Sequence, residues 1–238
     1  MVCDGKLPQM DPTQQHPFSK AERDAVYKAI FTRRDVRGEF LSQEIPDETL
    51  ARILKAAHHA PSVGFMQPWD FLLIRSKKVK QQVHQLFVKA DAEAAALFEG
   101  ERQQTYRNLK LEGILEAPLN VLITCDRSRS GPVVLGRTHM AEMDLYSSVC
   151  AVQNFWLAAR SEEVGVGWVS IMDPDALAKT LSLPEAVVPI AYLWVGYVSQ
   201  FHEKPELEKV GWLPRLELEQ VLHWEAWGGE REVGPLKK

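Results

Sequence analysis

The sequence predicts an α+β domain in which helices pack on one central mixed sheet. Three observations favour this class. Long stretches have helical apolar spacing, shorter apolar runs between them have strand character, and the two kinds alternate without a strict βαβ rhythm. The 238 residues, 45% of them hydrophobic, suffice for one sizeable core.

Two amphipathic helices are expected first, behind a polar lead-in. Residues 1–17 are polar and contain proline, so we expect a flexible segment rather than a signal peptide. A helix is expected from Ser19 to Ile30, because Ser19 suits the N-cap position and Glu22 completes a capping box. A second helix is expected over Asp47–Ala60, where apolar residues share one face and the following proline ends the helix.

Strands and helices then alternate along the chain. The expected strands are Phe71–Ile74, Asn120–Cys125, Gly165–Ile171 and Val188–Val198. The expected helices run from Ser76 to about Phe98, from Met140 to Arg160 and from Asp173 to Leu181. The helix from Met140 is the most apolar of the three, so we expect it to lie in the core.

Two polar segments stand apart from these elements. Ala92–Leu111 is alanine-rich and then charged, and it is expected to be helical, either as a lid over a site or as a solvated excursion. Residues 200–238 are polar with scattered tryptophans, so we expect this tail to cover a neighbouring subunit. Residues 18–238 are otherwise expected to form a single domain.

Composition excludes several classes of function. The net charge of −4 argues against non-specific nucleic-acid binding, and no apolar run is long enough to span a membrane. The three cysteines form no C-x-x-C pair, which favours a reducing cytoplasm. The histidines lack zinc-site spacing, so we expect no metal site. The P-loop, the G-x-G-x-x-G fingerprint and the G-x-S-x-G elbow are also absent from the sequence.

Three motifs remain that carry chemistry. The segment Arg33-Arg34-Asp35-Val36-Arg37 follows the first helix, and guanidinium groups suit phosphate and polar ring edges. Taken alone, such a cluster is more often a solvated basic turn. A loop with apolar tips spans Pro61–Trp69, and a glycine-flanked strand ends near Ser170. An anionic, planar and partly apolar ligand would use all three motifs.

The arginine segment, followed one helix later by the Pro-Ser to Gln-Pro-Trp loop, resembles the nitroreductase family of FMN proteins. The resemblance implies a three-layer fold with helices on both faces of the sheet. It also implies a homodimer with FMN at the subunit interface, and a C-terminal extension that reaches the partner subunit. The residues expected to bind FMN by this resemblance are Arg33, Arg34, Asp35, Val36, Arg37, Ser62, Met66, Leu109 and Ser170. Ser62 would come from the partner subunit.

Departures from the usual family pattern refine this expectation. The family usually has serine at the position of Asp35 and asparagine at that of Phe65. The strings RRDVRGEF, APSVGFMQPW and GVGWVSI resemble a branch of the family that consumes its flavin. This resemblance implies that reduced FMN is a substrate. Reaction with O2 would fragment it to 5,6-dimethylbenzimidazole, the lower ligand of cobalamin, and D-erythrose 4-phosphate.

The expected catalytic residues are Asp35, as a general acid/base, and Ser170, as a hydrogen-bonding group near the flavin N5. Flanking arginines are expected to favour the charged form of Asp35. A separate flavin reductase would supply reduced FMN, so that NAD(P)H acts only indirectly. Two alternatives stay open at this point: an ordinary NAD(P)H-dependent nitro- or flavin reductase, and an FMN carrier without turnover. Asp35 could also be a simple ion-pair partner, and Ser170 a strand-end hydroxyl.

Overall fold

The computed structural model describes residues 17–230, so the first sixteen residues of the expected lead-in lie outside the described part. The chain divides into two compact units, residues 1–203 and 204–238, and each is described by itself. Among the described residues, no helix combines the length and apolarity needed to cross a bilayer.

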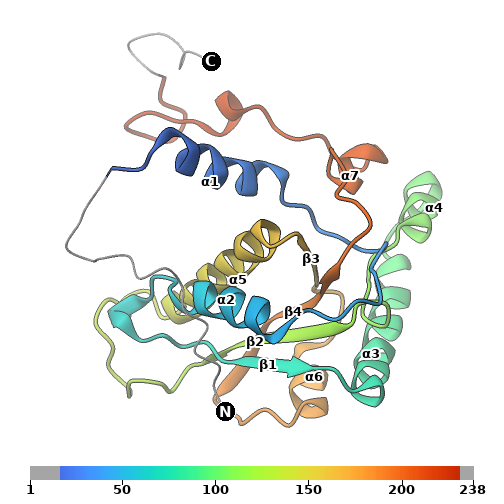
Figure 1. The fold of residues 1–238 in the computed structure, drawn as a ribbon, viewed down its shortest axis with the longest axis horizontal. Helices are drawn as coiled ribbons and strands as arrows, with labels where there is room; N and C mark the ends of the chain where they lie inside the picture. The colour runs from blue at the N-terminus through green and yellow to red at the C-terminus, as the bar shows by residue number, and fades with distance from the viewer. Residues whose placement is uncertain (1–16, 231–238) are drawn as a thin grey trace. The chain divides into compact units, whose positions relative to one another are not determined.

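The first unit holds the helices and strands that the sequence predicts, with ends shifted by up to three residues (Figure 1). Its helices are α1 (Lys20–Thr32), α2 (Asp47–His58), α3 (Lys77–Ala95), α4 (Gly100–Asn108), α5 (Met143–Ser161) and α6 (Pro174–Thr180), with a 3₁₀ turn η1 (Val63–Phe65). Its strands are β1 (Phe71–Ile74), β2 (Leu119–Asp126), β3 (Val164–Val169) and β4 (Val187–Tyr197).

The sheet has the order β1-β2-β4-β3, and its four strands pair antiparallel throughout. The parallel component of the expected mixed sheet is reduced to one bridge, between Asp35 and Val166. This bridge lies at the outer edge of β3. It therefore places the arginine segment, residues 33–37, beside the edge strand of the sheet.

Side chains of the sheet alternate between two cores, which makes the fold three-layered. On one face, Val121 and Leu193 pack with α2 and α5 in a buried cluster. On the other face, Leu122 and Trp194 pack with Val83 of α3 and with α6. The expected α+β class and the helices on both faces are thus confirmed (Figure 1).

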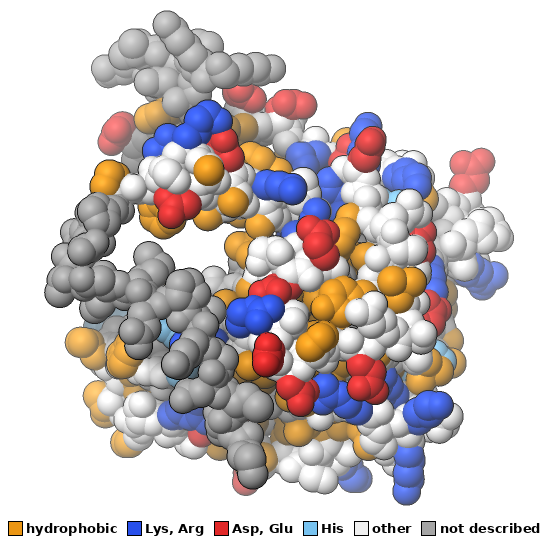
Figure 2. Space-filling view, in the orientation of Figure 1, with side chains coloured by type: hydrophobic (Ala, Val, Ile, Leu, Met, Phe, Trp, Pro, Cys, Tyr) orange, Lys and Arg blue, Asp and Glu red, His pale blue; other side chains and the backbone are white. Residues whose placement is uncertain are grey.

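Helix α1 begins where the sequence predicts, because the capping box forms. The Glu22 amide donates to Ser19 Oγ at 3.3 Å, and the Ser19 amide donates to Glu22 Oε2 at 2.7 Å. The helix nevertheless leaves apolar side chains in solvent, including Tyr27 and Phe31, which are 55% and 69% exposed. Figure 2 shows hydrophobic side chains among charged ones over this helix.

The expected helical excursion, residues 92–111, contains α4 and packs back on the end of α3. Tyr106 of α4 stacks on Phe98 with ring centroids 4.9 Å apart, and its hydroxyl donates to Asp91 at 2.8 Å. Burial, together with the hydrogen bond to Asp91, raises the pKa of Tyr106 to about 12. The segment is therefore anchored at α3, and its role as a lid stays a prediction.

The second unit contains the short helix α7 (Glu206–Lys209) and the 3₁₀ turn η2 (Leu218–Val221). No residue of the described part of this unit, 204–230, is buried, and Trp227 is 91% exposed. The ring of Trp227 lies 4.4 Å from that of His223. The unit thus presents apolar side chains to its surroundings, and its contact with a partner subunit stays a prediction.

Candidate functional site

The candidate site is built on the arginine segment, residues 33–37, which leaves α1 in an extended conformation. Arg33 caps the C-terminus of α1 with φ −60° and ψ 137°. The Val36 amide then donates to the Val166 carbonyl at 3.0 Å. The segment therefore meets β3 at a single parallel bridge, which fixes Asp35 relative to the sheet.

The carboxyl group of Asp35 is held by two donors. Its Oδ1 accepts a hydrogen bond from the Trp168 backbone amide at 3.1 Å, and its Oδ2 accepts from Arg37 Nε at 2.9 Å. The Asp35 side chain keeps 30% of its surface exposed. An acidic side chain is thus presented at the sheet edge with both oxygens oriented.

Burial sets the ionisation of this group. Desolvation raises the pKa of the Asp35 carboxyl, and the charge of Arg37, the Trp168 amide and the charge of Arg33 only partly oppose it. The flanking arginines do favour the charged form, as expected, but burial outweighs them and the pKa is raised overall. A carboxyl group with a raised pKa can exchange a proton nearer neutral pH, as general acid–base catalysis requires.

The three arginines of the segment have different surroundings. The Arg33 guanidinium lies over the ring of Trp156, 4.9 Å from its centroid. Arg34 Nη1 donates to the carbonyls of Phe31 at 2.8 Å and Arg33 at 2.7 Å, and its Nη2 donates to a third carbonyl, that of residue 203. Arg34 therefore stabilises the backbone of the segment, which the sequence did not indicate.

Arg37 connects Asp35 to the end of the α4 excursion. Besides its bond to Asp35, its Nη1 donates to the Lys110 carbonyl at 3.3 Å. Leu109, which was expected to contact FMN, is the C-cap of α4 and precedes Lys110 directly. Leu109 is therefore the sequence neighbour of a residue that Arg37 contacts. Val36 is buried beside β3.

Ser62 and Met66 belong to a separate loop beside α5. The Ser62 hydroxyl accepts a hydrogen bond from the Gln67 amide at 3.0 Å, and Met66 is buried with 3% exposure. The amide of Val63 donates to Ser147 Oγ of α5 at 3.0 Å, which fixes the loop on that helix. The contacts of Ser62 and Met66 with flavin stay predictions.

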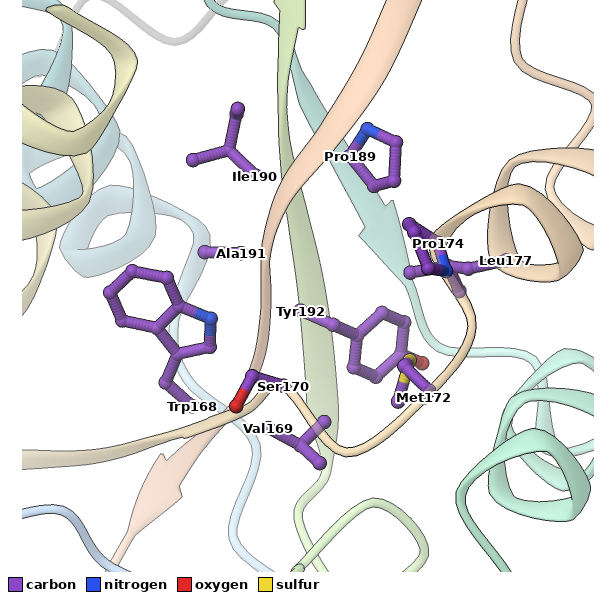
Figure 3. A pocket seen from close by; sticks show the side chains of 10 residues that line it. All are labelled: Trp168, Val169, Ser170, Met172, Pro174, Leu177, Pro189, Ile190, Ala191 and Tyr192. Atoms are coloured by element: carbon purple, nitrogen blue, oxygen red, sulfur yellow. The ribbon is translucent and has the colours of Figure 1, made fainter. Parts of the chain in front are cut away.

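Ser170 follows β3 directly, two residues after the amide that binds Asp35, and it is exposed. It lines a cavity of about 230 Å³ whose other walls are mostly apolar (Figure 3). The remaining lining residues are Trp168, Val169, Met172, Pro174, Leu177, Pro189, Ile190, Ala191 and Tyr192. The serine hydroxyl therefore stands at the rim of an apolar hollow beside the Asp35 strand.

Sequence reasoning missed the tryptophans that support this site. The Nε1 of Trp156 donates to the Arg34 carbonyl at 3.1 Å, and that of Trp194 donates to the Val36 carbonyl. One signal was present in the sequence. Gly165 and Gly167 lie two apart in a strand, on the same face, a pattern that marks a close approach of another group.

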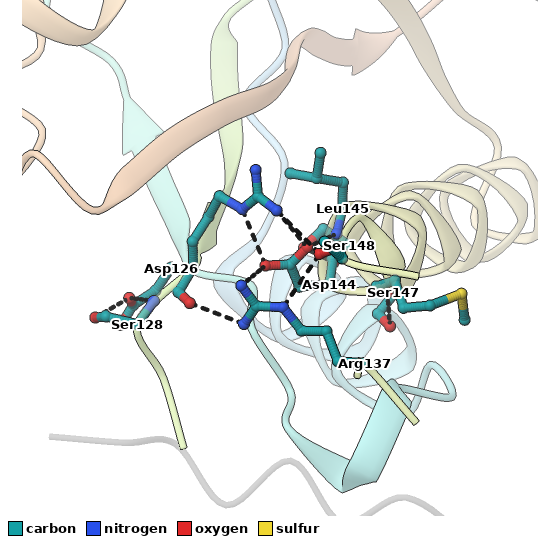
Figure 4. Close-up of polar contacts among 10 residues, drawn as sticks. Asp126, Ser128, Arg137, Asp144, Leu145, Ser147 and Ser148 are labelled. Carbon is teal, nitrogen blue, oxygen red and sulfur yellow. Dashed lines mark hydrogen bonds and ion pairs between the residues drawn. The ribbon is translucent and has the colours of Figure 1, made fainter. Parts of the chain in front are cut away.

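A second cluster of arginines lies on the loop before α5. Asp144 is fully buried and pairs with Arg127 Nε at 3.1 Å and with Arg137 Nη2 at 3.2 Å (Figure 4). Arg129 pairs with Asp70 at 2.7 Å and with Asp126 at 3.6 Å. We call these six residues the loop anchor, since their ion pairs and hydrogen bonds hold residues 127–142 on the domain.

Curated proteins of known function resemble this chain over most of its length. A 5,6-dimethylbenzimidazole synthase of Rhodospirillum rubrum is 40% identical over 83% of this chain and 93% of its own. A 5,6-dimethylbenzimidazole synthase of Rhodobacter capsulatus is 33% identical over 85% of this chain and 97% of its own.

Solved structures share the fold at lower identity. An oxidised iodotyrosine deiodinase bound to FMN and 3-iodo-L-tyrosine matches with a TM-score of 0.67 and 23% identity, over 84% of this chain and 99% of that one. A BluB-like flavoprotein from Clostridium difficile 630 matches with a TM-score of 0.63 and 19% identity, over the same shares of both chains. The model of the nitroreductase family matches residues 30–197, and together with the synthase relatives it shows that this chain belongs to the nitroreductase family.

Proposed function

We propose that this protein is a 5,6-dimethylbenzimidazole synthase. It would fragment reduced FMN in the presence of O2 to 5,6-dimethylbenzimidazole and D-erythrose 4-phosphate. Synthase relatives that are 31–40% identical over at least 83% of this chain support the reaction. The structural observation that supports it most is the half-buried carboxyl group of Asp35, held by Trp168 and Arg37 in the middle of the arginine segment.

The residues of the segment fit a bound FMN. The segment contains three arginines, whose guanidinium groups suit a phosphate and the carbonyl oxygens of the flavin ring. Arg33 and Arg37 would bind these groups, while Arg34 keeps the backbone in place through its carbonyl contacts. Reduced FMN supplies an electron-rich ring that reacts with O2, and the protein supplies orientation and proton transfer.

Asp35 would act as the general acid/base at the reacting ring or sugar-side carbons. Its raised pKa allows it to hold or release a proton, and the Trp168 amide orients it. Ser170, at the rim of the apolar cavity, would donate a hydrogen bond near the flavin N5. The α4 excursion with Leu109 would exclude water, since oxygen chemistry at a reduced flavin needs a dry site.

Aerobic incubation with chemically reduced FMN, followed by chromatography of the products, tests the proposal. We expect 5,6-dimethylbenzimidazole in stoichiometric relation to consumed FMN. Steady oxidation of NAD(P)H with intact flavin would instead indicate a nitro- or flavin reductase, and unchanged flavin would indicate a carrier. Ser170→Gly should consume reduced FMN and return oxidised FMN in place of the benzimidazole.

We further propose a cytoplasmic homodimer that receives reduced FMN from a separate flavin reductase. The exposed apolar residues of α1 and of residues 204–230 support burial against a second copy. Each site would then take Ser62 and Met66 from the partner subunit. Cys125 and Cys150 form no disulfide within the described part, and free thiols would be stable in a reducing compartment. Sedimentation showing a monomer that binds FMN would contradict the dimer.

A further inference from the structure

Buried indole groups bind the backbone on both sides of Asp35. Trp194, in the middle of β4, is fully buried and donates its Nε1–H to the Val36 carbonyl. Trp156, on α5, donates its Nε1–H to the Arg34 carbonyl at 3.1 Å. The two carbonyls flank Asp35 in the chain, so the position of this residue depends on indole donors from both sides of the sheet.

The indole of Trp194 reaches Val36 by crossing the edge strand at a glycine. A Cβ atom on Gly167 would collide with the Trp194 ring and with the Val36 carbonyl. The next residue, Trp168, donates its amide to Asp35 Oδ1 at 3.1 Å. Gly167 therefore permits an indole contact directly beside the amide that orients the Asp35 carboxyl.

We propose that Trp194 is a positioning residue for Asp35. Its indole N–H fixes the Val36 carbonyl against β3, and this keeps the Asp35 carboxyl within reach of the Trp168 amide and Arg37 Nε. The catalytic consequence rests on the proposed function, whereas the positioning itself does not. Removal of one indole N–H leaves the Val36 carbonyl without this buried donor, and the segment can then shift away from β3.

The ionisation of Asp35 reports this position. The charged groups that act on it are Arg37 and Arg33 of its own segment, and β3 contributes only backbone amides because Val164–Val169 contains no titratable residue. The hydrogen bonds from Trp168 and Arg37 lower its pKa against the effect of burial. A segment that moves away from β3 loses the Trp168 bond, but it also loses the burial that is the largest cause of the raised pKa, so the pKa falls toward its ordinary value.

The first test is a carbon-13 NMR titration of the Asp35 carboxyl in the flavin-free protein, with the signal assigned by its loss in Asp35→Asn. We expect Trp194→Phe to lower the pKa of Asp35 toward its ordinary value. Val83→Ala is the matched control, because Val83 is buried in the same hydrophobic cluster, and it should leave this pKa unchanged. An unchanged or higher pKa in Trp194→Phe would overturn the proposal, as would an equal fall in Val83→Ala.

If Trp194→Phe does not fold, benzothienylalanine at position 194 replaces the N–H with sulfur and keeps the ring volume. The same titration then applies, with the same two outcomes.

A second test is the single-turnover reaction of bound reduced FMN with oxygen. Loss of positioning should lower the rate of benzimidazole formation about 10- to 100-fold, while FMN affinity is unchanged. In the Asp35→Asn background, Trp194→Phe should have no additional effect, and a full additive loss would contradict the proposal. A wild-type protein that forms no benzimidazole would refute the proposed function alone, since the titration needs no flavin.

Discussion

The arginine segment and the loop anchor each combine three arginines with aspartate, but they differ in charge balance. In the loop anchor, Arg127, Arg129 and Arg137 are matched by three aspartates at distances of 2.7 to 3.6 Å. The arginine segment contains three arginines and one aspartate in five residues. The loop anchor is balanced by its own aspartates, and the arginine segment is the part for which we propose a bound anion.

The two aspartates also differ in solvent contact. Asp144 is completely buried beneath Arg127 and Arg137, and its main effect is to fix a loop. Asp35 keeps 30% of its side-chain surface exposed and has a raised pKa. Two aspartates in arginine-rich surroundings therefore differ in solvent access, and only Asp35 is proposed to react.

The largest effect expected from this comparison is on catalysis. Asp35→Asn should lower the rate of benzimidazole formation about 100- to 10,000-fold, because it removes a general acid/base, while the arginines still bind FMN. Single-turnover reaction of bound reduced FMN with oxygen, with the benzimidazole quantified afterwards, measures this rate. Formation at the wild-type rate would reduce Asp35 to an ion-pair partner of Arg37.

The next effect is on stability and concerns the loop anchor. Asp144→Ala should lower the free energy of unfolding by about 3 kcal/mol, since it leaves two arginines without their buried partner. FMN affinity of the folded protein should be unchanged. Asp24→Ala is the control, because its ion pair with Lys20 is exposed and contributes about 0.3–0.5 kcal/mol. Urea unfolding measures both variants, and equal losses would remove the distinction between the clusters.

The affinity for FMN should respond to changes in the arginine segment and not to changes in the loop anchor. Arg33→Ala and Arg37→Ala should each weaken FMN binding about 10- to 100-fold, through loss of charge-assisted contacts worth about 1.5–3 kcal/mol. Arg127→Ala removes the same charge from the loop anchor and should bind FMN as the wild type does. Flavin fluorescence titration compares the three variants. Similar losses in all of them would indicate a general effect of net charge.

The smallest expected effect is the pH dependence of stability. The raised pKa means that the folded state binds a proton at Asp35 more tightly than the unfolded chain does. This contribution to the free energy of unfolding is full below the ordinary value of 3.8 and decreases as the pH rises through the raised pKa. Asp35→Asn should lack this decrease. Urea unfolding at a series of pH values compares the two curves, and parallel curves would contradict the raised pKa.

Local patterns in the sequence predicted the helices and strands well. The capping box of Ser19 and Glu22 formed as expected, because both partners lie within one helical turn. Strand direction was less predictable, since the pairing of β2 with β4 depends on connections between distant residues. Met143, rather than Met140, begins α5, because Arg127 and Arg137 both donate to the carbonyl of residue 141 and hold the preceding loop in place.

The site was predictable as a set of residue types but not in its contacts. The arginine segment and Ser170 stand out by charge and by motif. The net pKa direction of Asp35 could not be inferred, because it depends on burial in the folded chain. The Trp168 amide that binds the carboxyl group is likewise 133 residues away in the sequence. The backbone role of Arg34 likewise depends on a carbonyl 169 residues away.

The Trp168 amide also gives this protein an internal reporter. Most amides of a strand face a carbonyl whose charge is constant, whereas this one faces a carboxyl group that titrates. An ionised Asp35 binds the amide proton more strongly and repels hydroxide, so exchange of this proton with deuterium should slow, relative to an unprotected amide at the same pH, as Asp35 loses its own proton. One exchange rate, followed over pH in the resting protein, thus reads the protonation of the proposed catalytic group without any substrate present.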